Sequence, residues 1–160
     1  MTPVGSYTVT VQQGAPRAIA AVSARVTARR IPEMFRVYLD QVYAAARSGA
    51  LHIDGQNIFV YRTVADLPEE IDVDFGVGIT APFAPTGSVR MVDLPTGEAA
   101  MTIHRGAYSG LGGAHAAVLA WCRTNGRSLA GTSWEIYGHW TENEAQLETT
   151  VCYLLAPTTR

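Results

Sequence analysis

The two halves of this 160-residue chain repeat one order of patterns, and this repetition is the strongest constraint on its fold. Ile58-Phe59-Val60-Tyr61 matches Trp134-Glu135-Ile136-Tyr137 at an offset of 76 residues, and Ala81-Pro82 matches Ala156-Pro157 at an offset of 75. Near-equal offsets indicate an internal duplication, although two common strand patterns can also coincide. We interpret the chain as two half-repeats, at about 1–83 and 84–160.

Hydrophobic periodicity predicts one helix in each half. Helical spacing begins at Pro32 and stops before Gly49, and a second helical run covers 114–122 before Gly126. Strand patterns cover 6–12, 18–26, 57–62, 71–80, 88–93, 97–104, 133–140 and 147–155. The predicted fold class is α+β: an antiparallel sheet of two pseudo-symmetric βαββ halves, with two helices on one face and a ligand groove on the other.

Charge and cysteine content argue against several functions. The formal net charge is −2, and the basic residues cluster only around Arg25, Arg29 and Arg30, with Arg17 nearby. A nucleic-acid binder usually carries a basic patch or stripe, so we expect no nucleic-acid binding by this chain alone. Two cysteines are too few for a disulfide framework or a cysteine-based zinc site.

Hydropathy, the acidic residues and the histidines bear on location, membrane partners and metal binding. No segment has the pattern of a signal peptide or reaches the ~20 apolar residues of a membrane span, so we expect a cytoplasmic protein without a membrane partner. The hydrophobic share of 48% and charged share of 16% leave apolar surface for a pocket or for a homodimer contact. The four histidines lack metal-binding spacing, and the acidic run from Asp66 to Asp74 is typical of a solvated surface. We predict no metal and no cofactor.

Glu135 is the most informative residue, because the stretch around it otherwise suits a strand interior. Strand side chains alternate, so Glu135 and Tyr137 share one face while Trp134 and Ile136 share the other. An unpaired carboxylate under a helix is costly. We therefore expect Trp134 and Ile136 to face the helices, and Glu135 and Tyr137 to face the groove.

A carboxylate in a groove of low polarity attracts cations. At ~4 Å and an effective dielectric constant of ~20, the attraction is about 4 kcal/mol before desolvation costs, and aromatic faces add roughly 0.5–2 kcal/mol. The alternative is an exposed Glu135, or one paired with an arginine such as Arg62 or Arg105. The predicted ligand-binding residues are Glu135, Tyr137, Tyr108, Tyr61, Phe75, Trp140 and His104.

The segment from His104 to Tyr108 links a strand to the second helix. Gly106 allows backbone angles that other residues avoid, and this places Tyr108 at the helix entrance, near the middle of the sheet. The alternative for His104 is a packed turn in which the ring is satisfied by hydrogen bonds, which is commoner than a functional histidine.

Four segments of the chain resemble a known family. They are His104-x-Gly106-x-Tyr108, Leu119-x-Trp121, Trp134-Glu135-Ile136-Tyr137 and Thr149 to Pro157. They resemble the GyrI-like small-molecule-binding family, which includes the effector-binding domain of multidrug-sensing transcription regulators. The resemblance covers nearly the whole chain, 1–160, as one domain, and is specific in the second half and loose in the first.

The resemblance implies a central pocket in which a carboxylate matching Glu135 faces lipophilic cationic ligands, with Tyr108 and Tyr137 matching aromatic pocket positions. Some stand-alone members resemble hydrolases that open cyclopropane-type electrophiles, using that glutamate and nearby aromatics to activate water. Two departures stand out. The 160 residues show no pattern of a DNA-binding domain, so we expect no direct transcription control by this chain, and Gly138-His139-Trp140 stands where the family often has a Leu/Asp-Pro type segment.

Three functions of different classes remain. The leading hypothesis is a stand-alone protein that senses or sequesters a small lipophilic molecule, cationic or electrophilic. The second is a hydrolase in which Glu135 is catalytic. The third is a protein-inhibitory module that acts through the acidic residues between Asp66 and Asp74.

Overall fold

The computed structural model describes residues 7–158, in which the strands and helices follow one another in the predicted order. Along the chain the elements are β1 (Thr10–Gln13), β2 (Ala18–Thr27), α1 (Ile31–Arg47), β3 (Ile53–Thr63), β4 (Glu70–Ile79), β5 (Arg90–Asp93), β6 (Glu98–Arg105), α2 (Leu111–Thr124), β7 (Leu129–Tyr137) and β8 (Glu148–Leu155). Short 3-10 turns η2 (Ala28–Arg30), η3 (Tyr108–Gly110) and η4 (Glu144–Gln146) join them. The strands within each unit described below pair antiparallel, and the α+β fold class is confirmed.

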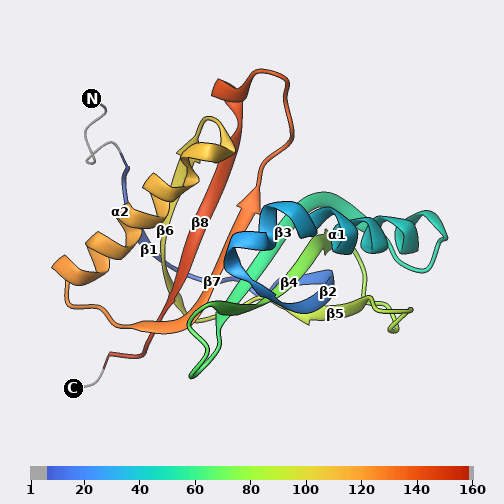
Figure 1. Ribbon diagram of the computed structural model, residues 1–160, viewed down its shortest axis with the longest axis horizontal. Coiled ribbons are helices and arrows are strands. Elements are labelled where there is room, and N and C mark those ends of the chain that lie inside the picture. The colour runs from blue at the N-terminus through green and yellow to red at the C-terminus, as the bar shows by residue number, and fades with distance from the viewer. Residues whose placement is uncertain (1–6, 159–160) are drawn as a thin grey trace. The chain divides into compact units, whose positions relative to one another are not determined.

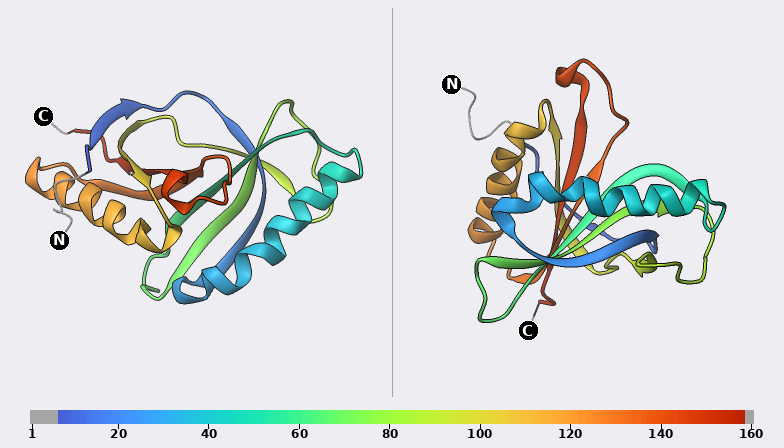
Figure 2. Two further views of the ribbon diagram at one scale, coloured as in Figure 1. Left: turned by 90° about the horizontal axis from the view of Figure 1, so that it is seen from above. Right: turned by 45° about the vertical axis from the view of Figure 1, so that its right-hand side comes forward.

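The elements form two compact units. Unit 2 comprises Pro16–Leu94, and unit 1 comprises Met1–Ala15 together with Pro95–Arg160. The strand order is β5-β2-β4-β3 in unit 2 and β1-β6-β8-β7 in unit 1. In each, a helix follows the second strand of that order and lies along one side of the strands (Figures 1 and 2).

The two units share one plan, yet their limits differ from the predicted half-repeats. The edge strand β1 precedes β2 in sequence but pairs with β6, and β5 precedes β6 but pairs with β2. Each half-repeat therefore contributes its first strand to the unit built by the other half. The duplication itself stays a prediction.

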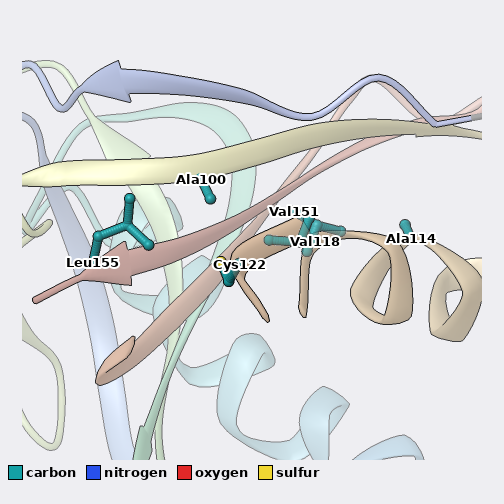
Figure 3. Close-up of a cluster of buried hydrophobic side chains, with 6 residues drawn as sticks. All are labelled: Ala100, Ala114, Val118, Cys122, Val151 and Leu155. Carbon is teal, nitrogen blue, oxygen red and sulfur yellow. The ribbon is translucent and has the colours of Figure 1, made fainter. Parts of the chain in front are cut away.

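The core of unit 1 lies between α2 and the strands β6 and β8. It contains Ala100 of β6, Ala114, Val118 and Cys122 of α2, and Val151 and Leu155 of β8 (Figure 3). The spacing i, i+4, i+8 on α2 puts its three residues on one helical face, and the spacing of four on β8 puts its two residues on one side of the strand. Burying a valine or leucine side chain contributes about 1.5–3 kcal/mol, so this cluster fixes the helix against the strands.

The core of unit 2 contains a cluster of aromatic rings among its aliphatic side chains. The Phe75 ring stacks on Tyr38 of α1 at 5.0 Å and meets Phe59 of β3 edge-on at 5.3 Å. Phe35 of α1 lies 6.0 Å from the same Phe59 ring. Phe75 is 0% exposed. These contacts mark the side of the unit 2 strands on which α1 packs.

The turn chemistry predicted most helix limits correctly. Pro32 lies in the first turn of α1, and both Gly49 and Gly126 have the positive φ, +85° and +65°, that is typical of a residue just after a helix. No helix in residues 7–158 is long and apolar enough to span a membrane.

Strand limits were predicted less well. Strand β1 begins at Thr10 rather than at 6, which lies outside the described residues. Strand β7 covers 129–137 rather than 133–140, because its last backbone contact with β8 is the bond from Gly138 N to Glu148 O at 2.8 Å. Trp140 therefore lies beyond the strand.

Candidate functional site: a buried glutamate under α2

Glu135 lies in the middle of β7, and its side chain points toward α2. Its partner across the strands is Val151, which belongs to the core cluster beneath α2. Only 6% of Glu135 is exposed. The expectation that Trp134 and Ile136 would face the helix is therefore wrong, since alternation sends these two side chains to the opposite face. The matching expectation, that Glu135 and Tyr137 face a groove on the side away from the helices, is wrong for the same reason.

Two hydrogen bonds explain why a carboxylate is tolerated under the helix. The Tyr137 hydroxyl donates to Glu135 Oε1 at 2.6 Å, and Nε2 of His115 on α2 lies 2.7 Å from Glu135 Oε2. Both carboxylate oxygens therefore accept a hydrogen bond, which is the role of the ionised form. Burial of a polar group is costly only when it lacks such partners.

Tyr153 of β8 extends this contact to a four-residue chain. Its hydroxyl lies 2.8 Å from His115 Nδ1, and the two rings meet edge to face at 5.6 Å. Burial, followed by the nearby charge of Glu135, raises the pKa of the Tyr153 phenol. We name Tyr153, His115, Glu135 and Tyr137 the polar chain of unit 1.

Tyr108 borders this polar chain on the solvent side. It lies in the η3 turn at the entrance of α2, as predicted, and its ring meets Tyr137 edge to face at 5.6 Å and 88°. Tyr108 is 40% exposed, and partial burial raises the pKa of its phenol. Tyr137 thus contacts the buried carboxylate, and the partly exposed Tyr108 contacts Tyr137.

His104 is held in place by contacts within unit 1. Its Nε2 lies 2.8 Å from the Ala107 carbonyl oxygen, which can only accept, and its Nδ1 lies 2.8 Å from the Tyr7 hydroxyl. Both ring nitrogens therefore have partners, as in the packed-turn alternative. A β-carbon at Gly110 would approach the His104 ring to 3.0 Å, which shows how closely the turn wraps this side chain.

The remaining predicted site residues are spread over both units. Tyr61 lies on β3 and Phe75 on β4 of unit 2, where Phe75 belongs to the core. Trp140 follows β7 in unit 1 and is 71% exposed. Of the predicted set, the structure of unit 1 joins Glu135 and Tyr108 through Tyr137, which contacts both.

The acidic run predicted to be a solvated surface is only partly so. Asp74 is 2% exposed and lies on the side of β4 away from α1, where it pairs with Arg62 and accepts a 2.5 Å hydrogen bond from the Ser23 hydroxyl. Asp72 pairs with Arg25 at 2.9 Å. In residues 7–158, no group of three or more His, Cys, Asp or Glu side chains is placed to hold a metal ion.

Sequence reasoning missed His115 and Tyr153. Periodicity contained the signal: His115 is one turn from Val118 on α2, and Tyr153 alternates with Val151 and Leu155 on β8. A polar residue within each apolar series indicates a polar contact under the helix. The register of β7 against β8, in which Ser133 lies opposite Tyr153, places Tyr153 near Glu135, and the packing of α2 on the strands brings His115 to Glu135.

Unit 2 also has an open hollow of about 380 Å³ at the end of β2 and the turn between β3 and β4. It is lined by Ala28, Thr63, Val64, Leu67, Pro68, Glu70 and Ile71. None of the predicted ligand-binding residues lines it.

Comparison with known proteins gives a family match. The model of the GyrI-like small molecule binding domain matches residues 7–155. No curated protein matches the chain.

Solved structures match over nearly the whole length. The EcmrR C-terminal domain is similar with a TM-score of 0.74 at 17% identity, covering 96% of this chain and 99% of that one. EcmrR in a DNA complex gives 0.79 at 16% identity, covering 95% of this chain and 58% of that chain.

Two further neighbours differ in what they are described to do. SAV2435, solved with bound tetraphenylphosphonium, gives a TM-score of 0.66 at 9% identity and covers 93% of this chain and 94% of its own. A protein of Listeria innocua described as a hydrolase gives 0.62 at 13% identity and covers 93% and 92%. At identities this low, the structural similarity shows a shared fold and no more.

Proposed function

This chain belongs to the GyrI-like family of small-molecule-binding domains, and we propose that its ligand is a small lipophilic cation bound against Glu135. The observation that carries the proposal is a buried carboxylate, 6% exposed, whose two oxygens both accept hydrogen bonds. Hydrogen bonds to both oxygens favour the ionised form of a carboxylate, and a charge of low exposure is screened less by solvent than a surface charge.

The aromatic side chains next to Glu135 support the same ligand class. Tyr108 and Tyr137 meet edge to face, and Tyr108 is 40% exposed. A cation over an aromatic face gains roughly 0.5–2 kcal/mol, and the ring surface favours apolar substituents on the same ligand. SAV2435 was solved with such a molecule, tetraphenylphosphonium, which makes this cation the natural probe.

The test compares one cation with one neutral molecule of similar shape. Titration calorimetry with tetraphenylphosphonium and with triphenylphosphine oxide should show that the wild type prefers the cation. In Glu135→Gln the cation should bind at least roughly fivefold more weakly, about 1 kcal/mol, because the charge is lost while the side-chain shape stays. Affinity for triphenylphosphine oxide should change little.

The matched control is Glu98→Gln, the same substitution in the same unit. The Glu98 side chain is 50% exposed and pairs with Arg127 at 2.8 Å, so its charge is not part of the polar chain. Equal cation affinity in wild type and Glu135→Gln would reject the proposal, as would an equal loss in both variants.

A second candidate function is hydrolysis of a reactive electrophile, which is supported by the contact between His115 and Glu135. A carboxylate within hydrogen-bond reach of an imidazole can receive a proton from water and pass it on, and His115 lies 2.7 Å from Glu135. The neighbour from Listeria innocua is described as a hydrolase. Turnover of cyclopropane-type alkylating compounds, lost in Glu135→Gln while binding is retained, would favour this function over binding alone.

A further inference from the structure

His115 joins the proposed binding carboxylate to a buried phenol. Its Nε2 lies 2.7 Å from Glu135 and its Nδ1 lies 2.8 Å from the Tyr153 hydroxyl. The His115 side chain is 25% exposed and the Glu135 side chain 8% exposed. Water therefore reaches the imidazole more readily than the carboxylate.

The same geometry accommodates two proton states. The carboxylate accepts, so His115 Nε2 carries a hydrogen in both. In the neutral imidazole, Nδ1 accepts from the Tyr153 hydroxyl; with a second proton, Nδ1 donates to the Tyr153 oxygen. The His115–Glu135 pair then has a net charge of −1 in the first state and zero in the second, with no movement of either side chain.

Three groups of unit 1 keep their protons near neutral pH. Imidazole side chains generally change charge between pH 5 and 8, whereas burial raises the pKa of the Tyr153 phenol, the Tyr108 phenol and the Cys122 thiol, so these stay protonated there. The titratable and charged groups on the α2 side of the strands packed against this helix are Glu135 and Tyr137 of β7, Tyr153 of β8, and Glu98 and His104 of β6. Tyr7 packs against α2 near Gly113, α2 itself carries Cys122 and Arg123, and Tyr108 lies at its entrance in η3.

We propose that His115 couples cation binding at Glu135 to the release of one proton. A monocation binds tightly when the imidazole is neutral, because the pair then carries −1, and weakly when the imidazole is protonated, because the pair is then neutral. The released proton passes from Nδ1 to solvent, and no other bond changes. His115 is thus a positioning residue that holds Glu135 and sets the charge the ligand meets. This inference rests on the proposed function.

The test follows tetraphenylphosphonium affinity from pH 5.5 to 8. This cation cannot lose a proton, so any dependence on pH comes from the protein. The wild type should bind about fivefold or more weakly at pH 5.5 than at pH 8, with a limit of tenfold per pH unit for one proton. His115→Gln should show one affinity throughout, because its amide still donates to Glu135 but cannot titrate. Triphenylphosphine oxide should show little dependence on pH.

The control is His52→Gln, since His52 is an exposed histidine of unit 2; it should keep the wild-type profile. A second measurement needs no variant: in nitrogen-15 spectra of wild type, the cation should lower the titration midpoint of one of the four histidine rings.

The outcomes separate the inference from the function beneath it. If the cation binds, Glu135→Gln weakens it, and the wild-type affinity is independent of pH, the proton coupling is wrong and the binding function stands. An equal pH dependence in His115→Gln would assign the proton to another group. If tetraphenylphosphonium does not bind at any pH, both proposals fail together.

Discussion

In unit 2 the residue of β3 that lies opposite Phe75 is Phe59, whereas in unit 1 the residue of β7 that lies opposite Val151 is Glu135. The helix residues that contact these two positions differ in the same way. Phe35 of α1 contacts Phe59, and His115 of α2 contacts Glu135. The same position between helix and strands thus holds an aromatic pair in one unit and an acid–base pair in the other.

The buried acids of the two units differ in the same way. Asp74 of unit 2 lies on the side of the strands away from α1, where it pairs with Arg62, and Arg90 lies 3.9 Å away. A guanidinium stays charged at every ordinary pH, so Asp74 has a fixed counter-charge. Glu135 lies under its helix with an imidazole, whose charge depends on pH. Under the proposed function, the acid of unit 2 serves the structure and the acid of unit 1 serves ligand binding.

The largest expected loss of stability comes from Phe75 of unit 2, whose ring contacts Phe59. Phe75→Ala should lower the free energy of unfolding by about 3–5 kcal/mol, because it removes a fully buried ring and leaves a cavity. Urea denaturation measures this, and cation affinity should stay within a few-fold below the transition. Unchanged stability with lost affinity would instead make Phe75 a ligand residue, as the sequence alone predicted.

Exchanging the pair of one unit for that of the other gives an intermediate effect. His115→Phe should cost about 1–3 kcal/mol of unfolding free energy, because a buried carboxylate loses a hydrogen bond. His115→Phe with Glu135→Phe should recover most of that loss, since well-packed apolar residues often replace buried ionic pairs without cost. The double variant should not prefer cations.

A denaturation cycle with Glu135→Phe alone measures the coupling between the two positions. If the two single losses simply add in the double variant, the residues are independent, and the comparison between the units would fail.

The smallest effect should come from the surface pair of unit 2. The Arg25 guanidinium, through its hydrogen bond, holds the pKa of Asp72 below the ordinary value. A carboxyl group whose pKa is lower in the folded state stabilises the fold at pH values above its ordinary pKa. This stabilisation is lost as the pH falls through the pKa of the folded state. Arg25→Gln should therefore move acid unfolding to a slightly higher pH, with stability at pH 7 reduced by less than in the other variants. An unchanged acid midpoint would contradict this.

Local chemistry explains which parts of the fold could be predicted. Pro32 cannot donate a backbone hydrogen bond, and the glycines at 49 and 126 adopt positive φ. The residue types at the helix ends therefore determine where these helices begin and end. The end of β7 was predicted poorly because it depends on where the backbone of another strand, at Glu148, stops pairing.

By itself the sequence determined the order of strands and helices and the presence of an acid within a strand, because alternation and turn chemistry act over a few residues. Only the tertiary structure decided which face that acid occupies. The cost of burying Glu135 depends on partners 20 residues away at His115 and 2 residues away at Tyr137, and strand pairing and helix packing bring the distant partner close. A charged side chain can be buried only where hydrogen-bond partners meet it, and tertiary packing rather than sequence spacing decides where those partners lie.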